Sequence, residues 1–382
     1  MQNMYLQSVR IQNFKQFSDI TFELDRKKNY AFNQNVLTSD GRFIKTALVF
    51  GKNGSGKTNL GLAIMDIILH LTDNIKDFTQ YTNYLNVDSE ERVAKFTYTF
   101  DINGKIVIYE YAKEQASFCK SEKLIFDNKL VFFVDRDSQK IETPGASNFE
   151  FSNILLDKFL QGKISILKYI ASNSPLSENN PLRELVTFVE GMLYFKRVDK
   201  GNNFIGFHQQ IDQNFLAYLV KNNYIEEFQV FLNEAGVNEK LVVEEDDDYQ
   251  KVRLYFAHKK ANLEFNEAAS SGTIALALQF YWFKNLTDKT QNASFVFIDE
   301  FDSFYHTELA NLIYCTFRDK CQCQCVMTTH NTNLMTNREG RCDAFYIVTP
   351  DKISAFSELT DREIREGNNV EKLYLANEFG IK

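Results

Sequence analysis

ALVFGKNGSGKT, residues 47–58, is the most informative stretch of this 382-residue chain. Its first four residues are all apolar, which is typical of a strand buried on both faces of a sheet. The next eight, from Gly51 to Thr58, fit the pattern G-x-x-x-x-G-K-[ST] of a phosphate-binding loop. Apolar residues then recur with helical spacing at Leu60, Ile64, Ile67, Ile68 and Leu71. A strand, a glycine-rich loop and a helix in this order predict an α/β fold that binds a nucleotide.

The chemistry of this loop follows from its residue types. Glycines let successive backbone N–H groups turn toward one anion, and the N-terminus of the following helix adds the positive end of its dipole. We expect Lys57 to reach the β- and γ-phosphates and the Thr58 hydroxyl to ligate Mg²⁺. ATP and Mg²⁺ are therefore the expected cofactors. The predicted ATP-binding residues are Gly51, Lys52, Asn53, Gly54, Ser55, Gly56, Lys57, Thr58 and Asn59.

A second apolar run, Phe295 to Ile298, ends in the acidic pair Asp299-Glu300. Acidic residues at strand ends are common, so the pair gains meaning only beside a phosphate-binding loop. In that combination, Asp299 is predicted to hold Mg²⁺ directly or through water. Glu300 is predicted to orient the attacking water and to deprotonate it as a general base.

Two further polar clusters could belong to the same site. Thr328-Thr329-His330-Asn331 follows a third apolar run, and the imidazole of His330 is predicted to sense the γ-phosphate. Ser270-Ser271-Gly272-Thr273 precedes a helical pattern, where it would by itself be a helix N-cap. Ligands bind at the carboxyl ends of strands in an open parallel sheet, so three apolar strands ending in polar residues predict one cleft. The predicted catalytic residues are Glu300, Lys57 and His330.

The rest of the sequence predicts antiparallel strands and a helical segment. Alternating apolar residues near the N-terminus predict two strands around a turn at residues 13–17. Residues 93–111 are predicted to form a hairpin, because Asn103-Gly104 is a strong two-residue turn signal. From about residue 150 to residue 236 the pattern is helical.

Composition excludes several classes of protein. Aromatic residues, mainly 35 Phe and 18 Tyr, make up 14% of the chain, and we expect them in a large core rather than stacked on single-stranded nucleic acid. The net charge of −8 argues against a surface that is basic throughout. Cys321, Cys323 and Cys325 alternate as on one buried face of a strand, rather than with the spacing of zinc ligands. Because no signal peptide or membrane-length apolar run is apparent, the chain is expected to be cytoplasmic.

The order of these motifs resembles the ABC-type ATPase heads of the RecF and SMC class. The opening VRIQNFKQFSDITFEL, residues 9–24, looks like the first hairpin of that class. More narrowly, the chain is similar to the AAA-labelled bacterial ATPases related to the OLD nucleases and to abortive-infection or phage-defence systems, whose signature is the short S-S-G-T of residues 270–273. Their acidic strand continues as D-E-x-D-x-x-x-H, which here runs from Asp299 to His306. Residues 368–380 are also similar to the end of that family.

The resemblance implies a site shared between two subunits. The P-loop and the acidic strand of one subunit would form its first half, with Thr58 and Asp299 as metal ligands. The signature of a second subunit would close over the γ-phosphate; it consists of Ser270, Ser271, Gly272 and Thr273. Asp302 would lie in the loop that contacts the second subunit, and His330 would be the switch histidine. Two ATP molecules would hold two copies together, so an ATP-dependent homodimer or a higher oligomer is expected.

The sequence also departs from the pattern of these relatives. It identifies no glutamine that would couple the first lobe to the metal. Thr307 follows His306, at a position where the pattern often has proline. Residues 150–236 are too short and too interrupted to form the coiled coil of a true SMC protein. Too few residues follow His330 for the nuclease domain of the OLD nucleases, so a nuclease or toxin effector is expected to be a separate chain.

The expected fold class is therefore α/β, a P-loop NTPase of the ABC-ATPase head type with a mixed sheet flanked by helices, an antiparallel β lobe and an inserted helical subdomain. Residues 1–135 and 251–382 would form the head, and residues 136–250 would form a mainly helical lid or specificity element.

The expected function is Mg-dependent ATP hydrolysis that drives ATP-sandwiched homodimerisation, as the ATPase or sensor subunit of an anti-phage defence system. A DNA-repair ATPase of the RecF/SMC type and an ATP-gated scaffold for a toxin or nuclease are the alternatives. DNA or a phage component could be sensed, and no membrane partner is expected.

Overall fold

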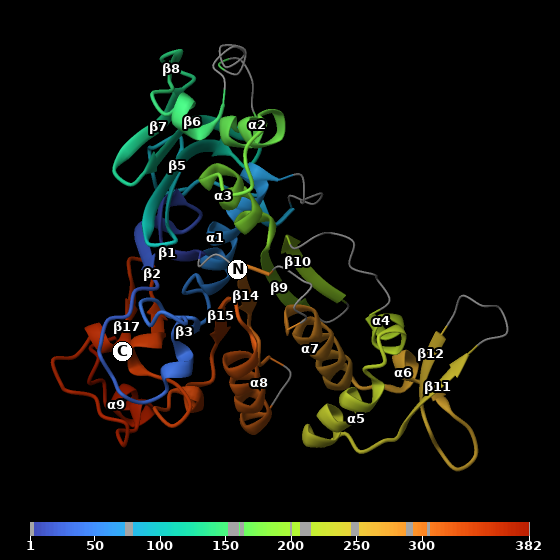
Figure 1. Cartoon of the computed structure of the whole chain (residues 1–382). Helices are drawn as coiled ribbons and strands as arrows, with labels where there is room; N and C mark the ends of the chain where they lie inside the picture. The colour runs from blue at the N-terminus through green and yellow to red at the C-terminus, as the bar shows by residue number, and fades with distance from the viewer. Residues whose placement is uncertain are drawn as a thin grey trace.

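The computed structural model describes residues 4–72, 79–151, 160, 164–198, 201–206, 215–245, 252–287, 293–303 and 306–381. These residues form two seven-stranded sheets and one three-stranded sheet, with helices packed against them (Figure 1). One large sheet is antiparallel and the other is mixed, which confirms the expected α/β class with an antiparallel lobe. Among the described residues, no helix is long and apolar enough to cross a membrane.

The antiparallel sheet has the strand order β2-β1-β4-β5-β6-β7-β8 and forms the upper lobe in Figure 1. Asn103 and Gly104 both have positive φ, 53° and 83°, which confirms the predicted two-residue turn. The predicted N-terminal hairpin is confirmed as well. The strands are β1 (Met4–Phe14), β2 (Phe17–Glu23), β4 (Ala94–Ile102), β5 (Lys105–Gln115), β6 (Phe118–Phe126), β7 (Lys129–Asp135) and β8 (Lys140–Glu142).

The mixed sheet, which we call the central sheet, has the order β10-β9-β14-β15-β3-β16-β17. Strands β9, β14, β15, β3 and β16 run parallel, and β10 and β17 pair antiparallel at the two edges. The carboxyl ends of the parallel strands therefore meet at one edge of the sheet, where ligands bind in open α/β sheets. The strands are β3 (Thr46–Phe50), β9 (Met192–Val198), β10 (Gly201–Gly206), β14 (Phe295–Asp299), β15 (Gln324–Thr329), β16 (Phe345–Val348) and β17 (Ile353–Ala355).

Helices cover the central sheet, and a small third sheet lies at its side (Figure 1). The third sheet consists of β11 (Leu241–Glu245), β12 (Val252–Phe256) and β13 (Leu263–Glu264). The α-helices are α1 (Lys57–Leu71), α2 (Ile166–Asn173), α3 (Pro181–Glu190), α4 (Phe215–Lys221), α5 (Ile225–Glu234), α6 (Phe265–Ala268), α7 (Ser271–Thr287), α8 (Thr307–Lys320) and α9 (Val370–Leu375). Short 3-10 helices lie at Gln34–Val36, Thr79–Tyr81, Ala146–Phe149, Thr332–Leu334, Cys342–Ala344 and Phe356–Glu358.

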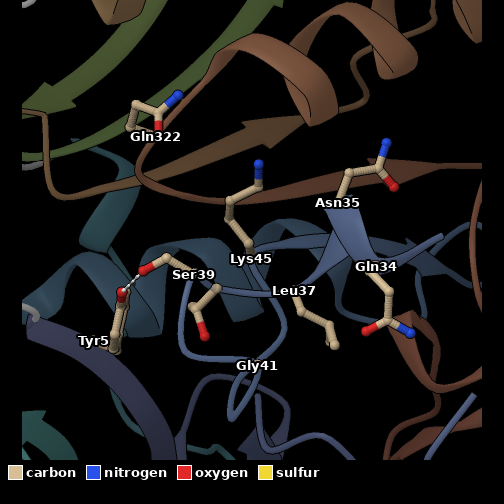
Figure 2. A pocket seen from close by; sticks show the side chains of 9 residues that line it. Tyr5, Gln34, Asn35, Leu37, Ser39, Gly41, Lys45 and Gln322 are labelled. Atoms are coloured by element: carbon tan, nitrogen blue, oxygen red, sulfur yellow. Dashed lines mark hydrogen bonds between the residues drawn. The ribbon is translucent and has the colours of Figure 1, made fainter. Parts of the chain in front are cut away.

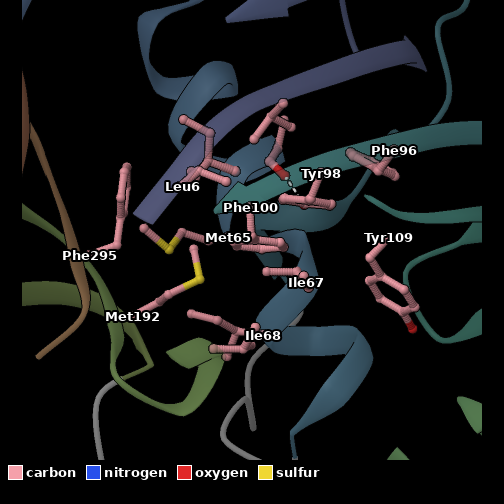
Figure 3. Close-up of a cluster of buried hydrophobic side chains, with 14 of the residues drawn as sticks. Leu6, Met65, Ile67, Ile68, Phe96, Tyr98, Phe100, Tyr109, Met192 and Phe295 are labelled. Atoms are coloured by element: carbon pink, nitrogen blue, oxygen red, sulfur yellow. Dashed lines mark hydrogen bonds between the residues drawn. The ribbon is translucent and has the colours of Figure 1, made fainter. Parts of the chain in front are cut away.

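Helix α1 runs through the core between the antiparallel sheet and the central sheet (Figure 3). Since it packs on both sheets, it is buried on nearly every side, as a helix inside a core must be. A Cβ at Gly61 would lie 2.6 Å from the Phe297 ring, so α1 packs tightly on β14. Along β14, Phe295 and Phe297 face this core, whereas Val296 and Ile298 face a second core that includes α7 and α8. The apolar strand is buried on both faces, as predicted.

The aromatic residues pack in these cores. The rings of Phe14 and Phe96 lie 5.3 Å apart at 67° inside the antiparallel lobe. The rings of Phe195 and Trp282 lie 5.2 Å apart at 15° on the other face of the central sheet. Offset and edge-to-face ring pairs are the favoured contacts of buried aromatics. The expectation that the abundant Phe and Tyr residues build the core is confirmed for these described residues.

A buried polar cluster joins α1 to the antiparallel lobe. The carboxylate of Asp66 on α1 accepts hydrogen bonds from the Lys113 ammonium at 2.6 Å, the Tyr84 hydroxyl at 2.7 Å and the Tyr111 hydroxyl at 2.9 Å. The side chains of Asp66 and Lys113 are 0% and 1% exposed. Taking both charges out of water is costly, and the pairing together with the hydroxyl donors offsets that cost. Removing one partner therefore leaves a buried charge without compensation.

We expect Lys113→Met to lower the free energy of unfolding by about 3–5 kcal/mol, because the Asp66 carboxylate would stay buried without its cation. Urea denaturation at pH 7 measures the change. Lys105→Met is the matched control, since Lys105 lies exposed on the same strand, β5. The control is expected to stay within about 0.5 kcal/mol of the parent. A Lys113→Met variant as stable as this control would contradict the interpretation.

The helical interpretation of residues 150–236 is wrong at residues 192–198 and 201–206. The described helices α2 to α5 lie in this segment, but β9 and β10 interrupt them. Strand β9 pairs parallel with the acidic strand β14, with Met192 opposite Phe295 and Lys196 opposite Asp299. The apolar run of residues 192–195 is only four residues long, and periodicity cannot separate such a run from a buried helical turn. The segment predicted as an insertion thus contributes two strands, β9 and β10, to the central sheet.

The alternating cysteines only partly follow the strand prediction. Strand β15 begins at Gln324, so Cys325 lies in it and Cys321 and Cys323 precede it. Cys321 and Cys325 are both buried, and all six cysteines are free thiols. Burial raises the pKa of the Cys323 thiol to about 12. The predicted buried strand face is therefore correct for Cys325 and wrong for the other two, which lie in the turn after α8.

Candidate functional site

The phosphate-binding loop connects β3 to α1, as the sequence predicts. The side chain of Lys57 is buried at the start of α1, and its ammonium donates to the backbone oxygens of Gly51 at 2.9 Å and Lys52 at 3.2 Å. Gly56 has a φ of 105°, and a Cβ at this position would lie 2.7 Å from the ring of Phe17. Only glycine fits there, because a side chain would be strained and would collide with the N-terminal hairpin.

The loop has the properties that a bound triphosphate requires. The Ser55 hydroxyl is buried and has no hydrogen-bond partner among the described residues. The N-terminus of α1 presents the positive end of the helix dipole to the same loop, and the first N–H groups of a helix have no partner within the helix. Burial lowers the pKa of Lys57, while Asp299 and Glu300 act against this shift. A buried lysine and an unsatisfied hydroxyl at a helix N-terminus form a suitable anion-binding site.

The structure brings the predicted metal ligands together. The Thr58 hydroxyl donates to Asp299 Oδ2 at 2.7 Å, although the two residues are 241 positions apart in the sequence. Asp299 is buried, and its carboxylate also accepts from the Thr328 hydroxyl at 2.7 Å and the Tyr194 hydroxyl at 3.2 Å. A hydroxyl oxygen and a carboxylate are hard donors of the kind that Mg²⁺ prefers. The chemistry of these donors therefore fits the expected metal.

Lys196, which sequence reasoning did not assign to the site, reaches these ligands from β9. Its ammonium lies 3.1 Å from Asp299 Oδ2, 3.0 Å from Glu300 Oε1 and 3.5 Å from Thr58 Oγ1. Burial acts against the charge, but the carboxylates of Asp299 and Glu300 outweigh it and raise the pKa of Lys196. A cationic group at the point where these oxygens converge shows that the position suits a cation. The resemblance predicts a glutamine near the metal, and the side chain that β9 supplies is a lysine.

Glu300 follows the acidic strand with a backbone conformation that is rare for a side-chain-bearing residue. Its φ is 50°, in the left-handed region, and its N–H donates to the Thr328 hydroxyl at 2.7 Å. Such conformations cost about 1–3 kcal/mol and persist where the surroundings enforce them, often at active sites. The side chain is 35% exposed and contacts Lys196. The carboxylate is therefore both fixed at the metal ligands and open to water.

A hydrogen bond joins the carboxyl end of β15 to the loop that follows β14. The Asp302 carboxylate accepts a hydrogen bond from the Thr329 hydroxyl at 2.6 Å, and burial raises the pKa of Asp302. His330 Nδ1 lies 3.4 Å from the Lys57 ammonium. Partial desolvation and the Lys57 charge lower the pKa of His330, which favours the neutral form of the imidazole. The structure thus places the predicted switch histidine beside the P-loop lysine.

The predicted signature begins at the N-terminus of α7. The Ser270 hydroxyl accepts a hydrogen bond from the Thr273 N–H at 3.1 Å, so the helix-capping role is confirmed. Thr273 is buried, Gly272 is partly exposed, and Ser270 and Ser271 are exposed. Helix α7 packs against α4 and α5. The signature therefore lies on the molecular surface at the start of a helix.

The side-chain contacts of two further residues, Gln16 and His306, were not predicted from the sequence. Gln16, in the turn between β1 and β2, donates to the Gly54 carbonyl at 3.3 Å and accepts from the Asn59 amide at 2.8 Å. The hairpin turn therefore contacts the P-loop and α1. His306, the last residue of the acidic motif, caps α8 by accepting from the Leu309 N–H at 3.1 Å. Phe304 and Tyr305 of that motif lie outside the described residues.

A cluster with the spacing of metal ligands also occurs inside the antiparallel lobe. His70, Cys119 and Glu122 are all buried, and their ligand atoms lie within 4.8 Å of one another. However, the Glu122 carboxylate accepts from the Ser165 hydroxyl at 2.7 Å and the Ile166 N–H at 2.8 Å, at the N-terminus of α2. Glu122 therefore acts as a helix cap whose acceptor positions are already occupied.

A cavity of about 370 Å³ lies away from the predicted site (Figure 2). Its lining includes Tyr5, Ser39 and Lys45, and the Lys45 ammonium donates to the Arg318 carbonyl at 2.7 Å. Lys45 immediately precedes β3, whereas the P-loop follows this strand. The cavity is therefore at the amino ends of the parallel strands, opposite the edge that carries the nucleotide-binding residues.

Comparison with known proteins gives one family match. The family model described as "AAA domain, putative AbiEii toxin, Type IV TA system" matches residues 47–336, from the strand before the P-loop to just past His330. A comparison with curated proteins found no match.

Solved structures of similar arrangement have low sequence identity. The SMC head domain from Thermotoga maritima is 14% identical with a TM-score of 0.43, covering 92% of this chain and 98% of that chain. An SMC head bound to the C-winged helix domain of ScpA is 16% identical with a TM-score of 0.43, covering 92% and 97%. The recombination mediator protein RecF with ATP is 15% identical with a TM-score of 0.40, covering 93% and 99%.

Proposed function

We propose, starting from the fact that this chain belongs to the AAA domain family whose model it matches, that it hydrolyses ATP with Mg²⁺ and that ATP joins two copies of it. Family membership makes the chain an ATPase of the AAA class. The observation that supports hydrolysis most strongly is the contact of Thr58 with Asp299 at 2.7 Å, with Glu300 directly beside them. A P-loop, a metal-binding acid and a partly exposed carboxylate are the groups that the reaction needs.

Each of these side chains would have a separate task. Lys57 would bind the β- and γ-phosphates through its ammonium, and Thr58 and Asp299 would hold Mg²⁺. The bound metal would neutralise charge that develops on the phosphates. Glu300 would orient a water molecule toward the γ-phosphate and accept its proton. Since the lowered pKa of His330 favours the neutral imidazole, it would contact the γ-phosphate as a hydrogen-bonding group rather than as a cation.

Phosphate release from the purified full chain tests the hydrolysis. We expect turnover with Mg²⁺ and ATP that stops when EDTA removes the metal. Binding of a fluorescent ATP analogue, measured on the same sample, separates binding from turnover. A chain that binds no nucleotide and releases no phosphate would overturn the proposal.

Homodimerisation rests on the resemblance to ATPase heads and on the position of the signature. Ser270 and Ser271 are exposed at the start of α7, where a second copy could bring them against a bound γ-phosphate. The backbone amides and dipole of a helix N-terminus suit an anion. Asp302 lies in the loop after the acidic strand, where the resemblance implies a contact between subunits.

Mixing two inactive variants tests whether the signature acts in the partner subunit. Lys57→Ala disables the P-loop and Ser271→Arg obstructs the signature, so each homodimer should be inactive. A mixed dimer would keep one intact site, and an equal mixture should recover about a quarter of the parent rate. Phosphate release before and after mixing measures the recovery. If the two variants remain inactive together, the signature does not act across a dimer.

We further propose that the ATPase serves in a defence system with a separately encoded effector. The printed description of the family, which names a toxin of a type IV system, supports this role. Affinity capture from the native host with ATP and with ADP tests the idea, followed by identification of the bound chains. A nuclease or toxin retained in one nucleotide state only is the expected result. Equal recovery in both states, or none in either, would contradict it.

A further inference from the structure

The contacts of Lys196 with the metal ligands carry a further inference. An ammonium group has three N–H donors and no acceptor. The three acceptors around the Lys196 ammonium are Asp299, Glu300 and Thr58, at 3.1, 3.0 and 3.5 Å. These include both predicted metal ligands and the predicted general base. The lysine therefore occupies the position to which the oxygens of the metal site point.

This position needs a positive charge. The side chain of Asp299 is 0% exposed, and a buried carboxylate without a compensating cation is strongly destabilising. The Lys196 side chain is only 22% exposed, so water screens the pair weakly. Lys57, the other nearby cation, donates to the backbone oxygens of the P-loop instead. Lys196 is thus the cation that balances Asp299 in this structure.

We propose that Lys196 is a built-in counter-ion that fills the metal position in the nucleotide-free protein, so that a divalent cation binds only together with nucleotide. The inference rests on the proposed function. It names a positioning residue that controls when the metal enters.

Geometry and charge both support this coupling. Mg²⁺ takes oxygen ligands at about 2.0–2.1 Å, so an ion bound directly to Asp299 Oδ2 would lie close to the Lys196 ammonium that contacts the same atom. Oδ2 also accepts from Thr58 and Tyr194, so three donors already surround it. A divalent cation alone must displace Lys196 and face its repulsion at close range. A triphosphate brings several negative charges, which favour both the metal and the displaced ammonium.

The binding of Mn²⁺, a paramagnetic substitute for Mg²⁺, tests the proposal on the full chain without nucleotide. Electron paramagnetic resonance would follow the free ion during titration. The parent should bind Mn²⁺ weakly, and Lys196→Met should bind it about tenfold more tightly or better, because the competing charge is gone. Lys196→Arg keeps the cation and should resemble the parent. Equal Mn²⁺ affinity of Lys196→Met and the parent would overturn the proposal.

Two additional measurements keep the result specific. Asp299→Asn added to Lys196→Met should remove the tight Mn²⁺ site, and a site that survives would show that the ion binds elsewhere and overturn the proposal. Lys196→Gln replaces Lys196→Met if the methionine variant fails to fold by circular dichroism. Nucleotide binding to the parent is measured separately. Its failure would reject the proposed ATPase, whereas Mn²⁺ affinities that do not depend on residue 196 would reject only this inference.

Discussion

Lys57→Ala is expected to reduce ATP turnover by about 10²–10³-fold or more, because the variant loses the cation that would bind the transferred phosphate. The ammonium is buried at the P-loop and is held there by two backbone oxygens, which pre-orients it for an anion. Lys196 cannot replace it, since its contacts are with Asp299 and Glu300. Phosphate release under saturating ATP measures the loss.

Lys95→Ala is the control for this variant, because Lys95 is exposed on β4 in the antiparallel lobe. It should retain the parent rate. Thermal unfolding of Lys57→Ala should stay close to the parent, since the folded chain loses only the contacts of the ammonium with the backbone oxygens of Gly51 and Lys52. Turnover that survives in Lys57→Ala, with the fold intact, would mean that the P-loop lysine has another role.

Glu300→Gln is expected to lower hydrolysis by about 10²–10⁴-fold, because the amide keeps the shape of the side chain but cannot accept a proton. ATP should still bind, since Lys57 and Thr58 are unchanged. Bound but unhydrolysed ATP should hold two chains together, so the variant should accumulate as a dimer. Light scattering coupled to size-exclusion chromatography, with ATP and with ADP, measures this state.

The control is Glu308→Gln, a matched substitution at an exposed position in the first turn of α8. It should hydrolyse ATP at the parent rate and show no persistent dimer. The two expected effects of Glu300→Gln can fail separately. Hydrolysis at the parent rate would reject Glu300 as the general base, whereas lost hydrolysis without a dimer would reject ATP-sandwiched assembly.

The parts of the site that the sequence predicts are those encoded by local patterns. Lys57 and Thr58 lie in one contiguous motif that fixes its own strand, loop and helix. Asp299 and His330 each end a short apolar strand, and strands of this kind align their carboxyl ends in a parallel sheet. Such signals do not depend on knowing which distant segments become neighbours.

The residues that were missed depend on long-range pairing. Lys196 follows the apolar run of β9, as Asp299 follows that of β14. The rule that ligands bind at the carboxyl ends of parallel strands could therefore have identified Lys196 too. The run was interpreted as helix because helical patterns surround it on both sides. Thr328 and Tyr194 contact Asp299 through side chains of neighbouring strands, and only the strand order reveals those contacts. Propensity carries no information about strand order.

The strand order of the central sheet also has a consequence during synthesis of the chain. β3 pairs with β15 and β16, which are made more than 270 residues later, as the pairs Thr46–Cys325 and Leu48–Phe345 show. The antiparallel lobe consists of hairpins between successive strands plus the β1–β4 pairing, and all of its strands are made by residue 142, so it can form while the ribosome is still translating the middle of the chain. The nucleotide site must wait for the last strands, because β3, the strand before the P-loop, has its two partners only in β15 and β16. We therefore expect a nascent chain halted before β15 to expose the edges of an apolar strand and to depend on chaperones until translation is complete.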